Sequence, residues 1–454
     1  MPIREKNSSG SEAHRAHCSE NMRNHLNIAS RVNFHDHFGL FKHTSIMFAA
    51  SLITGTCNYI YQIYMGKALG PESYGVFGSL FAIFYIVSVC GGTIQTSIAR
   101  FVSKLKAEGE YGNIGFLLYG MLKRMSILGI VMFLIFTFAG KYIASFLKIE
   151  SNELIIIVGI ILFLSFFLPI GTGALQGMER FWYLGTINIL NASSKLIFGI
   201  FLVCMGFGVA GALGGVAIAI FLALIAAFIP NIPVLKHKGS EFDFFQLYKY
   251  AFPVIIAVFC YTVPANIDVI MVKHFFDEYD AGIYTATSVL GKIVFFIPGA
   301  VSAVMFPKVS GMHTQKKRTF SLLNMCLIIA CSLSGPVALA YLLTPSLIVN
   351  FIFGPKYMEA TSLVGIYGLT MFFFTLFVIV SSYNLAIHNL KYVLIPVSFM
   401  FLLIFLLSIF HETMREMVMT MLYVSAILFF LSYFYTAWRE RKMPLVGMEQ
   451  ISIN

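Results

Sequence analysis

The sequence predicts an all-α integral membrane protein with about twelve transmembrane helices, and three observations support this. The chain of 454 residues is 58% hydrophobic and only 11% charged, with a mean hydropathy of +0.82. Soluble domains carry about 25% charged residues, so this chain has too little charge to cover a water-facing surface. Apolar stretches of transmembrane length recur, and most lysines and arginines fall in alternate connections between them. Lipid is the solvent that stabilises such a surface.

Twelve apolar stretches have the length of about 20 residues that a transmembrane helix needs. They cover residues 44–66, 77–99, 115–140, 153–176, 185–206, 209–233, 250–272, 284–306, 320–342, 361–386, 391–410 and 415–437. The connections are short, and no soluble domain interrupts the series. The sixth stretch contains GVAGALGGVAIAI, a run of small residues that lets neighbouring helices approach closely.

Six stretches precede residue 234 and six follow it, which predicts two lobes of six helices each. The N-lobe covers residues 44–233 and the C-lobe residues 250–437, with a cytoplasmic linker at 234–249. We expect the polar residues 1–43 to form a disordered cytoplasmic tail and residues 438–454 to form a second cytoplasmic tail.

The distribution of lysine and arginine predicts the orientation in the membrane. One set of alternate connections, which includes both tails, contains 23 of the 31 basic residues, whereas the other set contains 6. Cytoplasmic connections carry the excess of lysine and arginine in membrane proteins. We therefore expect a multi-pass protein of the cytoplasmic membrane with both termini in the cytoplasm, which also requires an even number of passes.

Several function classes are disfavoured by the sequence. The net charge of +10 does not indicate a nucleic-acid partner, because the basic residues lie in short clusters between apolar stretches. The seven cysteines include no C-x-x-C pair, so neither a metal site nor a disulfide framework is expected. Nucleotide-binding, serine-hydrolase and zinc-protease motifs are absent from the sequence. We expect a transporter without cofactors rather than an enzyme.

The two halves of the sequence resemble each other. The segment Lys67–Phe77, which follows the first stretch, pairs with His274–Tyr284, which follows the seventh, at an offset of 207 residues. Both segments contain a polar turn, a glycine and a bulky pair before the next helix. The same offset places Ala99–Ser103 beside Phe306–Ser310. These landmarks predict two parallel repeats about an axis along the membrane normal, with substrate bound between halves that rock against each other.

Four short motifs add a family resemblance. They are Ala68–Phe77, Leu175–Phe181, Asn266–Asp268 and Phe353–Ala360, in this order along the chain. Their order and spacing resemble the polysaccharide-transport, O-antigen flippase (Wzx-like) branch of the MOP superfamily. That superfamily also contains the MATE-like multidrug extruders and the lipid II flippases. The resemblance covers the chain from about residue 40 to residue 440. Lipid II flippases usually have fourteen spans, so twelve argue against lipid II as the substrate.

The resemblance implies a MATE-like, V-shaped pair of pseudo-symmetric lobes that alternate in access. It implies a flippase for a polyprenyl-pyrophosphate-linked oligosaccharide in surface polysaccharide biosynthesis. The expected partners are this lipid-linked oligosaccharide, membrane lipids, and glycosyltransferases or a polymerase of the same pathway. The alternative function is an ion-coupled exporter of small cationic compounds. Such an exporter needs paired carboxylates within one lobe, whereas the spans offer only Asp268.

Charged residues at membrane depth are costly and therefore indicate function. Lys195 lies near the middle of the fifth stretch. Asn188 and Asn191, seven and four residues before it, share its helix face. As a functional residue, Lys195 attracts a pyrophosphate or an acidic sugar. As a structural residue, it pairs with a carbonyl or a polar neighbour. Both interpretations stay open.

Lys292 and Asp268 lie at similar depths in the hairpin formed by the eighth and seventh stretches. They form a salt bridge, or else Lys292 faces the cavity and binds anionic substrate while Asp268 binds a coupling cation or proton. The family resemblance favours a cavity-facing Lys292. Arg100 lies at a cytoplasmic edge, where it anchors the topology or meets the pyrophosphate. Pro264 and Pro298, beside Asp268 and Lys292, are the hinge candidates, because proline interrupts a helix.

Overall fold

The computed structural model describes residues 9–235, 239, 242–296, 299–314, 319–387 and 389–442. In this part of the chain all regular structure is helical. The first half contains α1 (Ser9–Ala107), α2 (Tyr111–Phe138), α3 (Gly140–Phe146), α4 (Asn152–Ser165), α5 (Leu168–Gly177), α6 (Phe181–Leu202), α7 (Gly208–Phe228) and α8 (Ile232–Leu235). Helix α1 thus includes most of residues 1–43, whose expected state as a tail stays a prediction.

The second half contains nine α-helices. They are α9 (Phe244–Thr262), α10 (Ile267–Phe275), α11 (Glu278–Phe296), α12 (Gly299–Thr314), α13 (Phe320–Leu343), α14 (Pro345–Ile352), α15 (Thr361–Ala386), α16 (Leu394–Ile409) and α17 (Met414–Lys442). Short helices of other types connect some of them, including the 3-10 helix η3 (Pro355–Ala360) before α15.

The helices account for the twelve predicted passes. Nine helical stretches of the described chain are long and apolar enough to cross a membrane. Two of them contain two passes each, because Ser45–Ala107 is interrupted at Gly70 and Phe181–Leu235 is interrupted at Gly206 and Gly208. All three glycines have positive φ angles, which residues with a Cβ atom adopt only at a cost. Helices α11 and α12 lie where the eighth pass is expected, so the described chain is consistent with about twelve passes.

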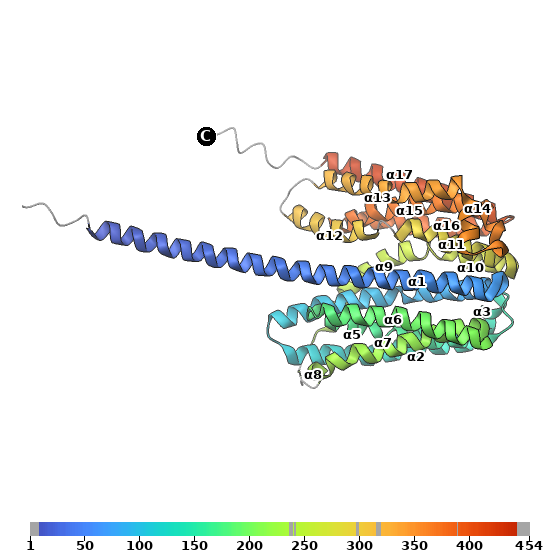
Figure 1. Ribbon diagram of the computed structural model, residues 1–454, viewed down its shortest axis with the longest axis horizontal. Helices are drawn as coiled ribbons and strands as arrows, with labels where there is room; N and C mark the ends of the chain where they lie inside the picture. Colours follow the sequence, from blue (N-terminus) through green and yellow to red (C-terminus); the bar gives the residue numbers. More distant parts are fainter. Residues whose placement is uncertain are drawn as a thin grey trace, which may run out of the picture.

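The helices form two lobes, as predicted. Helices α1 to α8 pack mainly with one another, as do helices α10 to α17, whereas α9 packs mainly against α1. Figure 1 shows the two groups as separate layers that run side by side and approach each other at one end of the bundle. The start of α1 and the end of α17 lie on the same side of the bundle, as an even number of passes requires.

The two lobes meet most closely where the second pass, in α1, contacts α11. A Cβ atom added to Gly75 would lie 2.6 Å from the carbonyl oxygen of Glu278, and one added to Gly282 would overlap the carbonyl oxygen of Pro71. Gly75 and Gly282 are equivalent in the repeat, as are Pro71 and Glu278. The contact is therefore symmetric, and the glycines let the two backbones touch.

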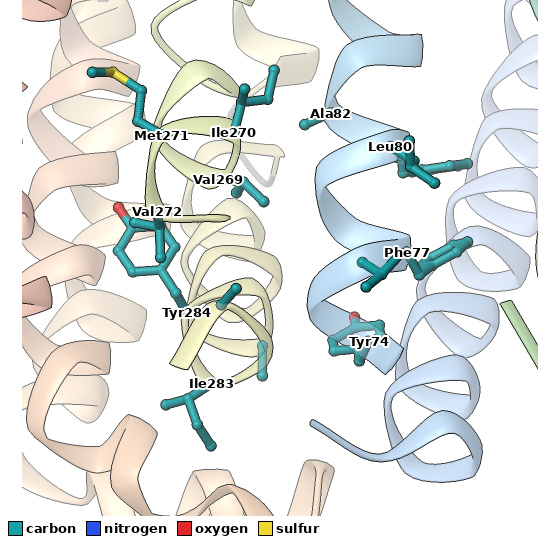
Figure 2. Packing of buried hydrophobic residues seen from close by; sticks show 14 of the residues in the cluster. Tyr74, Phe77, Leu80, Ala82, Val269, Ile270, Met271, Val272, Ile283 and Tyr284 are labelled. Atoms are coloured by element: carbon teal, nitrogen blue, oxygen red, sulfur yellow. The ribbon is translucent and has the colours of Figure 1, made fainter. Parts of the chain in front are cut away.

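The repeat axis passes through this contact. A Cβ atom at Gly78 would overlap the side chain of Thr285, which is the equivalent residue 207 positions later. Equivalent residues touch each other only at the axis that relates them. Phe77 and Tyr284 are also equivalent, and Figure 2 shows them pointing in opposite directions, each into its own lobe. The predicted internal repeat is thus visible in the packing of the two lobes.

Polar and aromatic contacts close the bundle around the glycine contact. The Tyr357 hydroxyl donates to the Gly66 carbonyl at 2.5 Å, which joins η3 of the C-lobe to α1. The Tyr74 ring packs against the rings of Phe353 and Tyr357, with centroids 6.0 and 6.2 Å away. We call this end, which holds residues 66–75, 139–151, 273–282 and 353–360, the closed end.

The opposite end carries the predicted cytoplasmic connections. Lys106 forms an ion pair with Glu179 at 2.7 Å, and Arg180 donates to the Pro230 carbonyl at 2.8 Å. These bonds bring the connections after the second, fourth and sixth passes together. We call this end, which holds residues 100–111, 178–181, 229–235 and 242–250, the basic end.

The orientation is testable with single cysteines in a cysteine-free background. Glu72 lies exposed at the closed end and Glu110 lies exposed at the basic end. We expect a membrane-impermeant maleimide to label Glu72→Cys in intact cells, but Glu110→Cys only after permeabilisation, because basic connections stay in the cytoplasm. The reverse labelling pattern would show that the protein is inserted the other way.

The glycine contact predicts that a single methyl group forces the closed end apart. Gly282→Ala places its Cβ atom against the Pro71 backbone, and overpacking of this kind costs about 1–3 kcal/mol. Thr285 is buried at the contact. We expect maleimide to label Thr285→Cys about tenfold faster in the Gly282→Ala variant than in the unmodified protein. Gly335→Ala is the matched control, because its nearest neighbour is 3.9 Å from the new Cβ atom. Equal rates in both backgrounds would contradict the proposed role of the contact.

Candidate functional site

The N-lobe holds a half-buried lysine in the middle of α6. The Lys195 ammonium group donates a short hydrogen bond to the Oδ1 atom of Asn58 on α1. It also lies 5.0 Å from the ring centroid of Tyr61 and 5.8 Å from that of Phe81. Aromatic faces attract cations, so this environment stabilises the charge without neutralising it. Asn188 and Asn191 are half-buried on the same helix, about two turns and one turn earlier.

The C-lobe holds a comparable lysine. The Nζ atom of Lys292, on α11, donates to Oδ1 of Asn266 at 3.0 Å. The amide nitrogen of Asn266 donates in turn to the Thr262 carbonyl at 2.8 Å, which fixes the direction of its oxygen. Each lobe therefore holds one half-buried lysine at membrane depth, and in each case the partner is an asparagine on the first pass of that lobe.

Asn266 lies where the seventh pass is broken. Helix α9 ends at Thr262 and α10 begins at Ile267, with residues 263–266 in a turn between them. Pro264 is buried in this turn, and proline cannot continue the backbone ladder because it lacks an N–H group. The break explains how Asn266 reaches Lys292. The hinge role of Pro264 stays a prediction, and Pro298 lies outside the described residues.

Asp268 lies in the first turn of α10 and is fully buried. Its Oδ2 atom accepts hydrogen bonds from the hydroxyls of Tyr367 at 2.7 Å and Tyr284 at 3.1 Å. Because the Tyr367 proton points to Asp268, the Ser288 hydroxyl donates to Tyr367, at 3.0 Å. The Oδ1 atom has no hydrogen-bond partner within the described chain. The position at a helix N-terminus favours a negative charge on this carboxylate.

Neither interior lysine forms an ion pair with an acid of the described chain, although the Asp268 carboxylate is near enough to Lys292 to attract its charge. The described residues form three ion pairs, at Lys104, Lys106 and Lys273, and none of them involves Lys195 or Lys292. The anticipated pair between Lys292 and Asp268 is not among them, since Lys292 bonds to Asn266 and Asp268 accepts from two tyrosines. The described interior thus carries two cations with neutral hydrogen-bond partners. An anionic group is the ligand that this charge pattern favours.

Sequence reasoning missed the part played by Lys273, which it treated as a lysine in a connection. Lys273 is fully buried, and its Nζ atom lies 2.9 Å from Oε1 of Glu278 and 3.3 Å from the Lys148 carbonyl of the other lobe. The adjacent His274 ring stacks on the Phe146 ring, with centroids 4.0 Å apart. Lys273 and His274 therefore join the lobes at the closed end. In the sequence, only the internal repeat, which aligns His274 with Lys67, draws attention to this segment.

Arg100 lies in a different place from the two interior lysines. It is exposed at the basic end of α1, and its guanidinium group stacks over the Tyr250 ring of α9 at 4.3 Å. Both residues line a cavity of about 340 Å³, together with Phe101, Lys104, Gln246 and Lys249. The structure therefore separates the predicted site residues into two groups, one within the lobes and one at the basic end.

Comparisons with known proteins point to a transport family. The model of a family described as "Polysaccharide biosynthesis protein" matches residues 123–362. An uncharacterized membrane protein of Methanocaldococcus jannaschii is 23% identical over 355 residues, which cover 74% of this chain and 81% of that protein.

Solved structures share the fold at low sequence identity. The inward-facing conformation of a multidrug resistance MATE family transporter of the MOP superfamily matches with a TM-score of 0.75 and 12% identity, over 84% of this chain and 94% of that one. The outward-facing conformation of such a transporter matches with a TM-score of 0.60 and 16% identity, over 88% and 96%. This structure is thus more similar to the inward-facing arrangement of helices.

Proposed function

We propose that this chain, which belongs to the polysaccharide biosynthesis protein family and is a transporter of the MOP superfamily, flips a polyprenyl-pyrophosphate-linked oligosaccharide across the cytoplasmic membrane. Its route lies between the two lobes, which alternate in access. The observation that carries the proposal is the pair of interior lysines, Lys195 and Lys292, with neutral asparagine partners.

The chemistry of a diphosphate group matches these lysines. A diphosphate brings negative charge to membrane depth, and two ammonium groups with spare donors offset the cost of removing it from water. The asparagine oxygens occupy only one of the three donors of each lysine, which leaves the others for substrate. An exporter of small cations fits this interior less well, because the ammonium groups of Lys195 and Lys292 repel a cationic substrate.

Asp268 is the candidate for coupling transport to an ion gradient. It is buried, one of its oxygens lacks a partner within the described chain, and it lies next to the broken seventh pass. A proton or cation that binds there changes the charge beside Asn266 and Pro264, where the helix is interrupted. We infer that this local change shifts the balance between the two access states.

The present arrangement represents the inward-facing state in this proposal. The closed end joins the lobes through Gly75, Gly282 and Tyr357, and the bias of lysine and arginine assigns that end to the outside. The higher TM-score with an inward-facing transporter supports the same assignment. In this state the substrate enters from the cytoplasmic side, where glycosyltransferases assemble it.

The direct test of the function is deletion of the gene in the native host. We expect a lipid-linked glycan to accumulate on the cytoplasmic side of the membrane and surface polysaccharide to be lost. Loss of resistance to small cationic compounds, with normal surface polysaccharide, would favour the exporter instead.

The interior lysines should be required for export. Each charged hydrogen bond contributes about 1.5–3 kcal/mol, so Lys195→Ala and Lys292→Ala should each reduce export about tenfold or more, and the double variant more strongly. Surface polysaccharide and protein level are measured together in the complemented deletion strain. Lys67→Ala, an exposed lysine at the closed end, is the matched control. Normal export by the double variant would remove the basis for an anionic substrate.

Asp268 should be required for coupling rather than for substrate binding. Asp268→Asn keeps the shape of the side chain but cannot change charge. In vesicles that contain the purified protein, we expect gradient-driven transport to fall about tenfold or more, within the usual range of coupling energies. Substrate exchange without a gradient should persist. Glu153→Gln, at an exposed position, is the control. An unchanged response of Asp268→Asn to the gradient would show that coupling occurs elsewhere.

A further inference from the structure

The cavity at the basic end joins the two lobes. Phe101 and its neighbours come from α1 of the N-lobe, whereas Gln246 and its neighbours come from the first turns of α9 in the C-lobe. We propose that this cavity binds the diphosphate group of the lipid-linked substrate at the membrane boundary, before the sugar enters between the lobes. The inference rests on the proposed function and adds a loading site separate from the interior lysines.

Charge is the first argument for a phosphate ligand. Three of the six lining residues are cations, namely Arg100, Lys104 and Lys249. Lys104 lies 3.9 Å from Glu108, a long contact between exposed side chains, and no carboxylate of the described chain pairs with the other two. The cavity therefore has an excess of positive charge that a multiply charged anion neutralises better than a singly charged one.

The geometry of Arg100 is the second argument. The Cζ atom of its guanidinium group lies over the Tyr250 ring, 4.3 Å from the ring centroid, and this contact restricts the side chain. A guanidinium edge binds two phosphate oxygens at once. The Gln246 amide adds a neutral donor on the α9 side of the cavity. A diphosphate has enough oxygens to contact donors of both lobes together.

The surroundings of the cavity suit a lipid-linked anion. Phe245 and Phe252 on α9 are 72% and 65% exposed and lie seven residues apart, so they share one face of the helix. Such an apolar face in a membrane protein contacts lipid. A prenyl chain can thus stay in the bilayer along α9 while its diphosphate occupies the cavity. A phosphodiester lipid carries a single charge, so we favour the diphosphate carrier over bulk anionic lipid.

The position between lobes gives the cavity a role in loading. A ligand that bonds to Arg100 on α1 and Lys249 on α9 stabilises the arrangement in which these two helices are adjacent, since it binds that state best. Substrate loading would then favour the state in which the closed end is sealed. The interior lysines receive the diphosphate only after it leaves this first site.

The test measures binding of farnesyl diphosphate to the purified full-length chain in phosphatidylcholine nanodiscs. We expect Arg100→Gln/Lys249→Gln to weaken binding about tenfold or more, because two charged contacts are lost. Lys123→Gln, which removes an exposed charge at the same end but outside the cavity, should bind like the unmodified chain. Arg100→Lys/Lys249→Arg keeps the charge of the cavity but removes the guanidinium group from the Tyr250 ring, so it should bind more tightly than Arg100→Gln/Lys249→Gln and less tightly than the unmodified chain.

Each other outcome overturns a different statement. If phosphatidylglycerol in the nanodiscs abolishes farnesyl diphosphate binding to the unmodified chain, the cavity binds bulk anionic lipid. If Arg100→Gln/Lys249→Gln binds farnesyl diphosphate as tightly as the unmodified chain, the cavity is not the loading site, although the proposed function survives. If the unmodified chain binds no farnesyl diphosphate, the proposed function fails, and the loading site fails with it.

Discussion

The contact of two backbones at Gly75 and Gly282 determines how the rest of the molecule is arranged. It places the repeat axis between α1 and α11, so that the equivalent residues Phe77 and Tyr284 point into opposite lobes. Each lobe can then build its own interior around its own aromatic residues. A larger side chain at either glycine would separate the helices. The lobes would then lose the close contact on the repeat axis about which they are related.

The interiors of the two lobes have similar charge but different construction. Lys195 lies on the fifth pass and Lys292 on the second pass of the C-lobe, although both bond to an asparagine on the first pass of their lobe. Duplication alone therefore did not produce the pair of lysines. Asp268 has no counterpart in the N-lobe, where the residue 207 positions earlier is Tyr61. In the proposed function, this asymmetry would let the C-lobe respond to ions while both lobes contact an anionic substrate.

Much of the fold was predictable because membrane passage imposes strict rules on sequence. Span length, the lysine and arginine bias and the repeat offset together predicted about twelve passes in two lobes. The structure confirms the two helical lobes and is consistent with that number of passes. Side-chain partners were less predictable. Lys292 was expected either to pair with Asp268 or to face substrate, yet it bonds to Asn266, because a broken helix turns that amide toward it. The burial of Lys273 depends on contacts with residues more than one hundred positions away, which no local pattern reveals.

The aromatic residues at the closed end have a consequence for the membrane itself. A passage wide enough for a sugar chain also admits water and small ions, which would dissipate any electrochemical gradient. Tyr74, Phe353 and Tyr357 pack together there, and the hydroxyl of Tyr357 is used by the Gly66 backbone, so little polar surface is left to conduct protons. In the proposed inward-facing state, this aromatic packing would keep water and small ions from crossing between the lobes at the closed end.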